Sequence, residues 1–328
     1  MKKHSRIFLT IPLAMTLLLS VIWVSQAKAA DYPDKPVVLV VPFSPGGGTD
    51  ILARLVGAEI EKGLGQPIVI ENRPGASGAV GAEHVARQEA DGYSLIFGTS
   101  TTHAIAPIIS KTKMSGILKK FSPVSEVAKS SLILAVPSSS SIKTLDDFVA
   151  AAKAETMTYG TYGIGSTPHL LGALFASETG AQMVHVPYKG SSPAVADVTG
   201  GHIKSAFLTV TALTGSLKGG ELRGLAVAGS SRLEAFPDIP TFAEAGYKGF
   251  DNAGWYGIFA PVNTPADIRN KIAGAVAKAV RAPSVIKRFK DLGLTPVGST
   301  PEALQVDWDQ SVELVKSILA KTKLKIQK

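Results

Sequence analysis

The sequence has no cysteine among its 328 residues. The chain therefore has no disulfide staple, no thiolate metal site, no cysteine nucleophile and no lipidated N-terminal cysteine. Beyond residue 30 it also lacks any run of eighteen or more unbroken apolar residues, which a membrane-spanning helix needs. The folded part must rest on a hydrophobic core, and a hydrophobic content of 45% supports one.

Signatures of catalysis and metal binding are missing as well. There is no G-x-S-x-G elbow, and the triple glycine at 46–48 fits neither a P-loop nor a dinucleotide fingerprint. The histidines at 103, 169, 185 and 202 lie more than a dozen residues apart, with no Asp or Glu three or four residues further on. We expect no metal, no cofactor and no catalytic residue, and an exported hydrolase or isomerase is the less favoured interpretation.

The charge balance is mild. Of the 34 Lys and Arg residues, Lys2, Lys3, Arg6 and Lys28 precede residue 30, a segment without Asp or Glu, so 30 bases face 26 acids further on. A net charge of +4 dispersed along the sequence does not indicate a nucleic-acid partner.

The first 29 residues have the order of a secretory leader. A basic start is followed by an apolar run from Ile7 to Val24 and by the small-residue site Ala27-Lys28-Ala29. The alternative is an uncleaved membrane anchor, but Pro12 and several hydroxyl residues interrupt the run. We expect cleavage after Ala29 and export to the periplasm.

From residue 36 onward, short β-branched runs alternate with amphipathic stretches, which predicts strand–helix units in a largely parallel α/β sheet. Strands are expected at 37–41, 68–70, 94–98, 158–162 and 183–186, with helices from about 51 and from about 79 to 90. These units predict two α/β lobes with a ligand cleft between them. Residues 30–128 together with 236–328 form the first lobe, and residues 129–235 form the second.

The loop that follows the first strand carries Gly46, Gly47 and Gly48 directly before a helix. Such glycines let the backbone approach a ligand and leave the first helical N–H groups free to meet an anion. The alternative is a tight turn that merely packs. Asp50, in the first helical turn, is either a structural cap or, less favourably, a ligand contact.

Hydroxyl residues follow the third, fourth and fifth expected strands. Ser100, Thr101, Thr102, Ser166, Thr167 and Ser192 can each bind a carboxylate or cap a helix. The stretch 99–103 is expected to be a polar loop. Arg73 and Lys189 are candidate cations, with a solvated surface position as the alternative.

Together these loops resemble the substrate-binding proteins of tripartite tricarboxylate transporters, often called Bug receptors. The matching stretches, in family order, are Tyr32-Pro33-Asp34-Lys35-Pro36, Val41-Pro42-Phe43-Ser44-Pro45-Gly46-Gly47-Gly48-Thr49-Asp50, Glu71-Asn72-Arg73-Pro74-Gly75-Ala76, Asp91-Gly92-Tyr93, His185-Val186-Pro187-Tyr188-Lys189-Gly190 and Leu225-Ala226-Val227.

The resemblance implies a type II-like periplasmic binding protein fold, a monomer that closes on a small organic carboxylate and passes it to membrane transporter subunits. By position, the implied ligand contacts are Phe43, Ser44, Gly46, Gly47, Gly48, Ser77, Ser100, Thr101, His103, Ser166, His169 and Tyr188. A ligand-loaded sensor partner of a signalling kinase is the alternative role.

Two stretches depart from the family pattern. Residues 104–120 replace a longer segment with Asn-Pro and an acidic turn, and His202-Ile203-Lys204 replaces Gln-Val-Asp. Both stretches fall where specificity can be set, so the resemblance does not identify the substrate.

Overall fold

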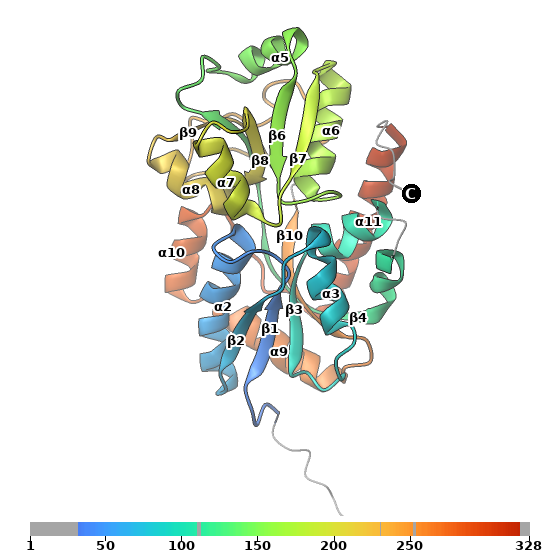
Figure 1. Cartoon of the computed structure of the whole chain (residues 1–328). Coiled ribbons are helices and arrows are strands. Elements are labelled where there is room, and N and C mark those ends of the chain that lie inside the picture. The colour runs from blue at the N-terminus through green and yellow to red at the C-terminus, as the bar shows by residue number, and fades with distance from the viewer. Residues whose placement is uncertain (1–31, 110–112, 230, 252–253, 322–328) are drawn as a thin grey trace, which may run out of the picture.

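The computed structural model describes residues 32–109, 113–229, 231–251 and 254–321, and the leader with its cleavage site lies outside the described residues. The chain forms two lobes, each built on its own β-sheet (Figure 1). The expected two-lobed α/β fold is confirmed. No helix of the described residues is long and apolar enough to cross a membrane.

The first lobe contains a six-stranded sheet with the order β11-β4-β10-β3-β1-β2. Its strands are β1 (Val37–Val41), β2 (Ile68–Asn72), β3 (Ser94–Thr99), β4 (Phe121–Lys129), β10 (Trp255–Pro261) and β11 (Thr295–Pro296). β1 pairs in parallel with β2 and β3, whereas β10 runs antiparallel to β3 and β4. The sheet is therefore mixed, and the expectation of a largely parallel sheet was wrong for this lobe.

Helices cover both faces of this sheet. The helical segments are α2 (Gly48–Leu64), η1 (Ala76–Gly78), α3 (Ala79–Val85), η2 (Thr101–Ile105), α4 (Ala106–Ile109), η3 (Lys113–Lys120), α9 (Ala266–Ala279), α10 (Pro283–Asp291) and α11 (Pro301–Lys321). Alternate residues of β1 point to opposite faces, with Val37 and Leu39 in the cluster of α2, α9 and α10, and Val40 in that of α3 and α11.

The second lobe contains a five-stranded sheet with the order β7-β6-β8-β5-β9. Its elements are β5 (Leu132–Pro137), α5 (Leu145–Ala154), β6 (Met157–Thr161), α6 (Thr167–Thr179), β7 (Met183–Pro187), α7 (Ser191–Thr199), β8 (Ser205–Thr209), α8 (Val210–Lys218) and β9 (Leu222–Ala228). Figure 1 shows α6 on one side of this sheet and α7 and α8 on the other.

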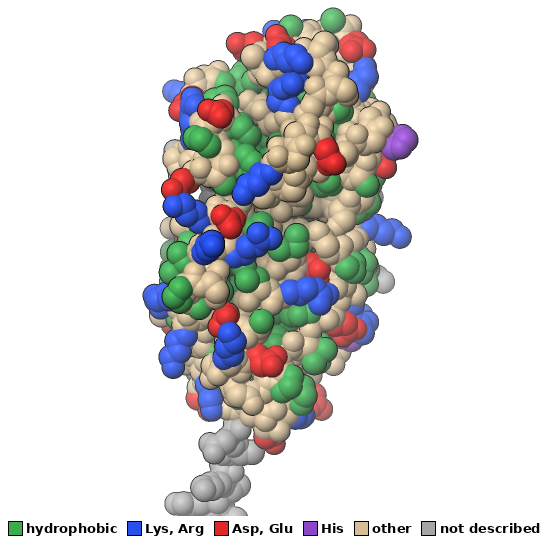
Figure 2. All heavy atoms as spheres, turned by 90° about the vertical axis from the view of Figure 1, so that its left-hand side faces the viewer, with side chains coloured by type: hydrophobic (Ala, Val, Ile, Leu, Met, Phe, Trp, Pro, Cys, Tyr) green, Lys and Arg blue, Asp and Glu red, His purple; other side chains and the backbone are tan. Residues whose placement is uncertain are grey.

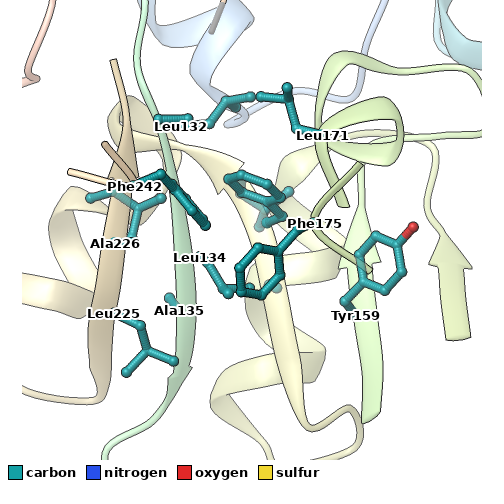
Figure 3. Packing of buried hydrophobic residues seen from close by; sticks show 14 of the residues in the cluster. Leu132, Leu134, Ala135, Tyr159, Leu171, Phe175, Leu225, Ala226 and Phe242 are labelled. Carbon is teal, nitrogen blue, oxygen red and sulfur yellow. The ribbon is translucent and has the colours of Figure 1, made fainter. Parts of the chain in front are cut away.

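The chain passes between the lobes twice, from β4 to β5 and from β9 to β10. After β9 it stays on the second lobe for some twenty residues, because Thr241 forms a bridge to Val227 and Phe242 is fully buried there. Figure 3 shows Phe242 and Phe175 of α6 packed near Leu134 of β5. The lobe limits given above stay a prediction.

Helix α11 connects the two lobes a third time without a chain crossing. Leu304 and Trp308 lie in the core of the first lobe, whereas Val315 and Ile318 lie in the core of the second. A capped start, Ala303 N–H to Thr300 Oγ1, and Pro301 fix where this helix begins. The lobes therefore touch through apolar side chains as well as through the two crossings.

Lys, Arg, Asp and Glu side chains are interspersed over the face that carries α2, α7 and α8 (Figure 2). Neither sign of charge forms a continuous field on this face, in keeping with the mild charge balance of the sequence.

Candidate functional site

The loop between β1 and α2 is held by a buried carboxylate. Asp50 Oδ2 accepts hydrogen bonds from Gly46 N (2.9 Å) and Arg54 Nε (3.1 Å), and Asp50 Oδ1 accepts one from Asn72 Nδ2 (2.9 Å). Asn72 Nδ2 also donates to Phe43 O at 3.1 Å. Asp50 therefore fixes the shape of the loop, which favours the structural interpretation over a ligand contact.

Burial alone would raise the pKa of Asp50, but hydrogen bonds from Arg54, Gly46 and Asn72 outweigh it and hold the pKa below its usual value. The carboxylate is thus charged in the folded protein at neutral pH.

The start of α2 has no side-chain cap. Gly47 is the N-cap residue, and its missing side chain leaves the first N–H groups of a 17-residue helix without a capping partner. Gly46 adopts φ +74°, which glycine tolerates without strain. The predicted glycine loop therefore presents helix N–H groups and a positive helix end to the space between the lobes.

The second lobe meets this loop directly. Ser44 Oγ donates to Lys189 O (3.2 Å), and Ser192 Oγ donates to Pro45 O (3.0 Å). Helix α7 begins here at a second uncapped glycine, Gly190. The structure therefore brings the N-termini of α2 and α7, one from each lobe, to the same place.

A second contact between the lobes consists of hydroxyl groups. Thr167 Oγ1 lies 3.1 Å from Ser100 Oγ and 3.0 Å from Thr101 Oγ1, and Thr101 Oγ1 donates to Tyr162 Oη at 3.3 Å. Ser166, rather than Thr167, caps α6 by accepting from the N–H of His169. Thr167 is therefore released from capping and faces the first lobe.

The stretch expected to be a polar loop is helical, so that expectation was wrong. Residues Thr101–Ile105 form a π-helical turn that continues into α4, and all five are buried. The Thr102 hydroxyl contributes to this turn, because Thr102 Oγ1 accepts a hydrogen bond from Thr99 N at 2.9 Å. Burial against α11 overrides the weak helix propensity of threonine.

His103 is not in the cleft. Its ring stacks on Phe259 at 3.9 Å and meets Trp308 edge-on, inside the core of the first lobe. The desolvation caused by this burial lowers the pKa of His103 to about 3. The structure therefore separates His103 from the other residues implied by the resemblance.

His169 and His185 form a stacked pair behind the loop that ends β6. Their ring centroids are 3.9 Å apart, and His169 Nδ1 accepts a hydrogen bond from Gly165 N at 3.0 Å. Burial lowers the pKa of His169 to about 4 and that of His185 to about 3. Both rings are neutral at neutral pH and support the loop that carries Ser166.

The remaining predicted residues lie at or beside the boundary between the lobes. Ser77 donates to the carbonyl of Ile164 in the other lobe, and the ring of Phe43 meets Tyr162 edge-on at 5.5 Å. Tyr188 Oη donates to Asp197 Oδ2 at 2.5 Å, within its own lobe. Ser77 and Phe43 therefore link the lobes, whereas the Tyr188 phenol connects the end of β7 to α7 within the second lobe.

Between these contacts lies a small inner pocket that the sequence interpretation missed. It has a volume of about 10 Å³ and is lined by residues of both lobes and both crossings, namely Thr49, Thr99, Ser100, Ser130, Tyr162, Thr209, Gly254, Trp255 and Tyr256. Thr209 ends β8 and begins α8, the same strand–helix junction that marked the other loops, so its position could have been found. Tyr256 lies within a buried strand and gives no local signal.

The start of α8 faces the start of α2. A Cβ atom placed on Gly48 would lie 2.5 Å from Thr209 Oγ1 and 3.3 Å from Thr211 Cβ. Four helices, α2, α6, α7 and α8, thus begin at the boundary between the lobes. Their positive ends favour an anionic ligand, and among the described residues no group of three His, Cys, Asp or Glu could hold a metal.

Comparison with known proteins identifies the family of this chain. The family model of the tripartite tricarboxylate transporter family receptor matches residues 52–326. Protein BugT of Bordetella pertussis is 36% identical over 299 residues, covering 88% of this chain and 92% of BugT.

Two solved structures superpose closely. R. palustris Rpa4515 with adipate is 34% identical with a TM-score of 0.85, covering 88% of this chain and 98% of that one. MatC from Rhodopseudomonas palustris with bound malate is 31% identical with a TM-score of 0.83, covering 88% of this chain and all of that one.

The resemblance inferred from the loop motifs is confirmed by these matches, which span most of the chain. The chain therefore belongs to the tripartite tricarboxylate transporter receptor family, whose members are solute-binding receptors and not enzymes.

Proposed function

We propose that this protein is a periplasmic receptor that encloses a small organic carboxylate between its lobes and delivers it to a tripartite transporter in the membrane. The observation that carries the proposal is the uncapped start of α2, which faces the starts of α7 and α8 across the lobe boundary. A carboxylate placed there receives helix N–H groups from both lobes.

The energetics of this site are sufficient for a receptor. Three hydrogen bonds to a charged group contribute about 1.5–3 kcal/mol each, and micromolar binding needs about 8 kcal/mol. Closure and ordering of the loops oppose binding, so burial of the ligand's carbon skeleton must contribute the difference. Phe43 and Tyr162, whose rings meet across the cleft, offer such an apolar surface.

The solved relatives support a carboxylate ligand, since one was solved with adipate and another with malate. For this chain we propose that Gly46, Gly47 and Gly48 hold the carboxylate through the backbone. The hydroxyls of Ser44, Ser77, Ser100 and Thr101 join the lobes around it.

The direct test is a ligand screen on protein that has been stripped by partial denaturation and refolding. At a hundred times its dissociation constant, a ligand adds about 2.7 kcal/mol to the free energy of unfolding, a rise in Tm of several degrees. We expect at least one mono-, di- or tricarboxylate to raise the Tm and no sugar or polyamine to do so. A response to sugars or polyamines alone would refute the proposal.

A matched pair of glycine variants tests the position of the site. Gly48→Val places a Cβ 2.5 Å from Thr209 Oγ1 and 3.3 Å from Thr211 Cβ of the other lobe, so the lobes must shift apart, and we expect binding to fall at least about a hundredfold and the Tm to fall as well. Gly274→Val, on an open face of α9, makes the same change in a helix with no contact within 4 Å of the added Cβ. It should change stability only slightly, since valine is no worse a helix former than glycine, and leave binding unchanged.

A further inference from the structure

Net positive charge is concentrated in one part of the first lobe. Charges of both signs occur along the whole chain, but residues 266–291, which contain α9 and α10, hold seven Lys and Arg residues and two Asp residues. Their net charge of +5 is larger than the +4 of all residues from 30 onward, so the remaining residues together carry one negative charge in excess. These two helices therefore account for the net positive charge.

The cations of α9 share one face of the helix. Lys271 and Lys278 lie two turns apart, and Arg281 follows in the turn that ends the helix. All three residues are exposed, whereas Ile272, on the opposite face, is fully buried in the core. A Cβ placed on Gly274, between the two lysines, would meet no atom within 4 Å. The three cations thus form an open row about 15 Å long.

This row is not neutralised by carboxylates. Lys290 of α10 forms an ion pair with Glu234 at 2.6 Å. Within the described part of the chain, the other exposed cations of α9 and α10 form none, namely Lys271, Lys278, Arg281, Lys287 and Arg288. Asp267 lies on the same face of α9 but in its first turn, where a carboxylate favours the positive helix end.

The row lies far from the ligand cleft. A Cβ on Gly63, near the end of α2, would be 3.3 Å from the Cβ of Ala275, so α9 packs against the C-terminal part of α2. Gly48, at the cleft, is about 22 Å away along the α2 axis. Figure 1 shows α9 at the lower end of the first lobe, away from the second lobe. Opening or closing of the lobes therefore leaves this face accessible.

An open row of unpaired cations suits an extended anionic partner. A single carboxylate or phosphate ion is bound by donors that converge on it, and cations spread over about 15 Å of an open helix face do not converge. Anionic phospholipid headgroups form a flat array that attracts several Lys and Arg side chains at once. Delivery of a solute to a membrane transporter also brings this protein to such a surface.

We propose that Lys271, Lys278 and Arg281, together with Lys287 and Arg288 of α10, form a docking surface for the anionic phospholipids of the membrane that holds the transporter. Each Lys or Arg near an anionic membrane strengthens binding roughly fivefold at low ionic strength. The surface keeps the receptor close to the membrane, where the transporter lies. It is separate from the carboxylate site, so each proposal can fail alone.

The test measures co-sedimentation of the processed protein, without its leader, with lipid vesicles. Vesicles of equal parts phosphatidylglycerol and phosphatidylcholine are compared with vesicles of phosphatidylcholine alone at low ionic strength. We expect binding to the phosphatidylglycerol vesicles only. The binding should disappear at about 1 M salt, where the Debye length falls to about 3 Å.

Two triple variants of equal charge locate the surface. Lys271→Gln with Lys278→Gln and Arg281→Gln should weaken vesicle binding at least about tenfold. The control variant replaces Lys153, Lys218 and Lys248, exposed residues of the second lobe that form no printed-range ion pair with Asp or Glu, by Gln. It should keep most of the binding. The basic C-terminal residues 321–328 are the same in both variants and cannot cause a difference between them.

The alternative role of Lys278 and Arg281 is structural, because cations stabilise the C-terminal end of a helix. That role would change the Tm and leave vesicle binding as it is in the control variant. Absence of wild-type binding to phosphatidylglycerol vesicles, equal binding to phosphatidylcholine alone, or an equal loss in both triple variants would overturn the docking surface. Titration of a carboxylate into the α9 variant should give wild-type affinity, and a loss of that affinity would contradict the separation of the two sites.

Discussion

Removal of the Asp50 carboxylate should both destabilise the protein and weaken ligand binding. In Asp50→Ala the amide of Asn72 and the N–H of Gly46 lose an acceptor, and Arg54 loses its ion pair. An unpaired donor costs about 1–3 kcal/mol. Gly46 is exposed and can be hydrated, and Arg54 is 52% exposed, so these two contribute the low end of their ranges.

These contributions sum to about 3 kcal/mol, which corresponds to a fall in Tm of roughly 6–12 °C for a protein of this size. The Gly46 amide would also lose its anchor, and Asn72, which donates to the Phe43 carbonyl, would lose its contact with Asp50. We therefore expect the affinity for the carboxylate identified in the screen to fall at least about tenfold. Differential scanning calorimetry and titration calorimetry measure the two effects on the same protein.

The pH dependence provides an independent check. The folded pKa of Asp50 is lowered, so its contribution to stability is present above the unfolded pKa and is lost as pH falls below it. The difference in Tm between the wild type and Asp50→Asn should therefore shrink as pH approaches 3. A variant that loses affinity while its Tm stays within about 2 °C of the wild type would refute the anchoring role and indicate a direct ligand contact instead.

Four further outcomes are expected. Burial, together with a neighbouring carboxylate, raises the pKa of Glu126 to about 8, so its folded form loses stability as pH rises from about 4.5 to 8, and Glu126→Gln should raise the Tm more at pH 9 than at pH 5. Burial lowers the pKa values of His169 and His185, so wild-type stability should fall as pH drops from 6.5 toward 4, and His185→Phe should reduce that loss in thermal scans. Phe242→Ala opens a cavity in a fully buried aromatic cluster and should cost about 3–5 kcal/mol in denaturant unfolding, whereas an effect below about 1 kcal/mol would contradict the packing. N-terminal sequencing of exported protein should start at Ala30 or within two residues of it, and recovery from membranes alone would contradict cleavage.

The strand–helix units could be predicted because their signals are local. The expected strand at 37–41 coincides with β1, and the three glycines lie at the start of α2, as expected. Apolar periodicity and glycine restrict the backbone within a few residues, so neighbouring sequence suffices to find them. The family motifs, which lie in such loops, were identifiable for the same reason.

Tertiary contacts decided the roles of the individual side chains. His103 carries the polarity of a ligand contact, but α11, two hundred residues further along the chain, encloses it in the core. Thr209 and Tyr256 meet Gly48 only because the two crossings bring both lobes together at the start of α2. Since burial and hydrogen-bond partners depend on residues far away in sequence, the local pattern could place the glycine loop but could not determine which hydroxyls face it.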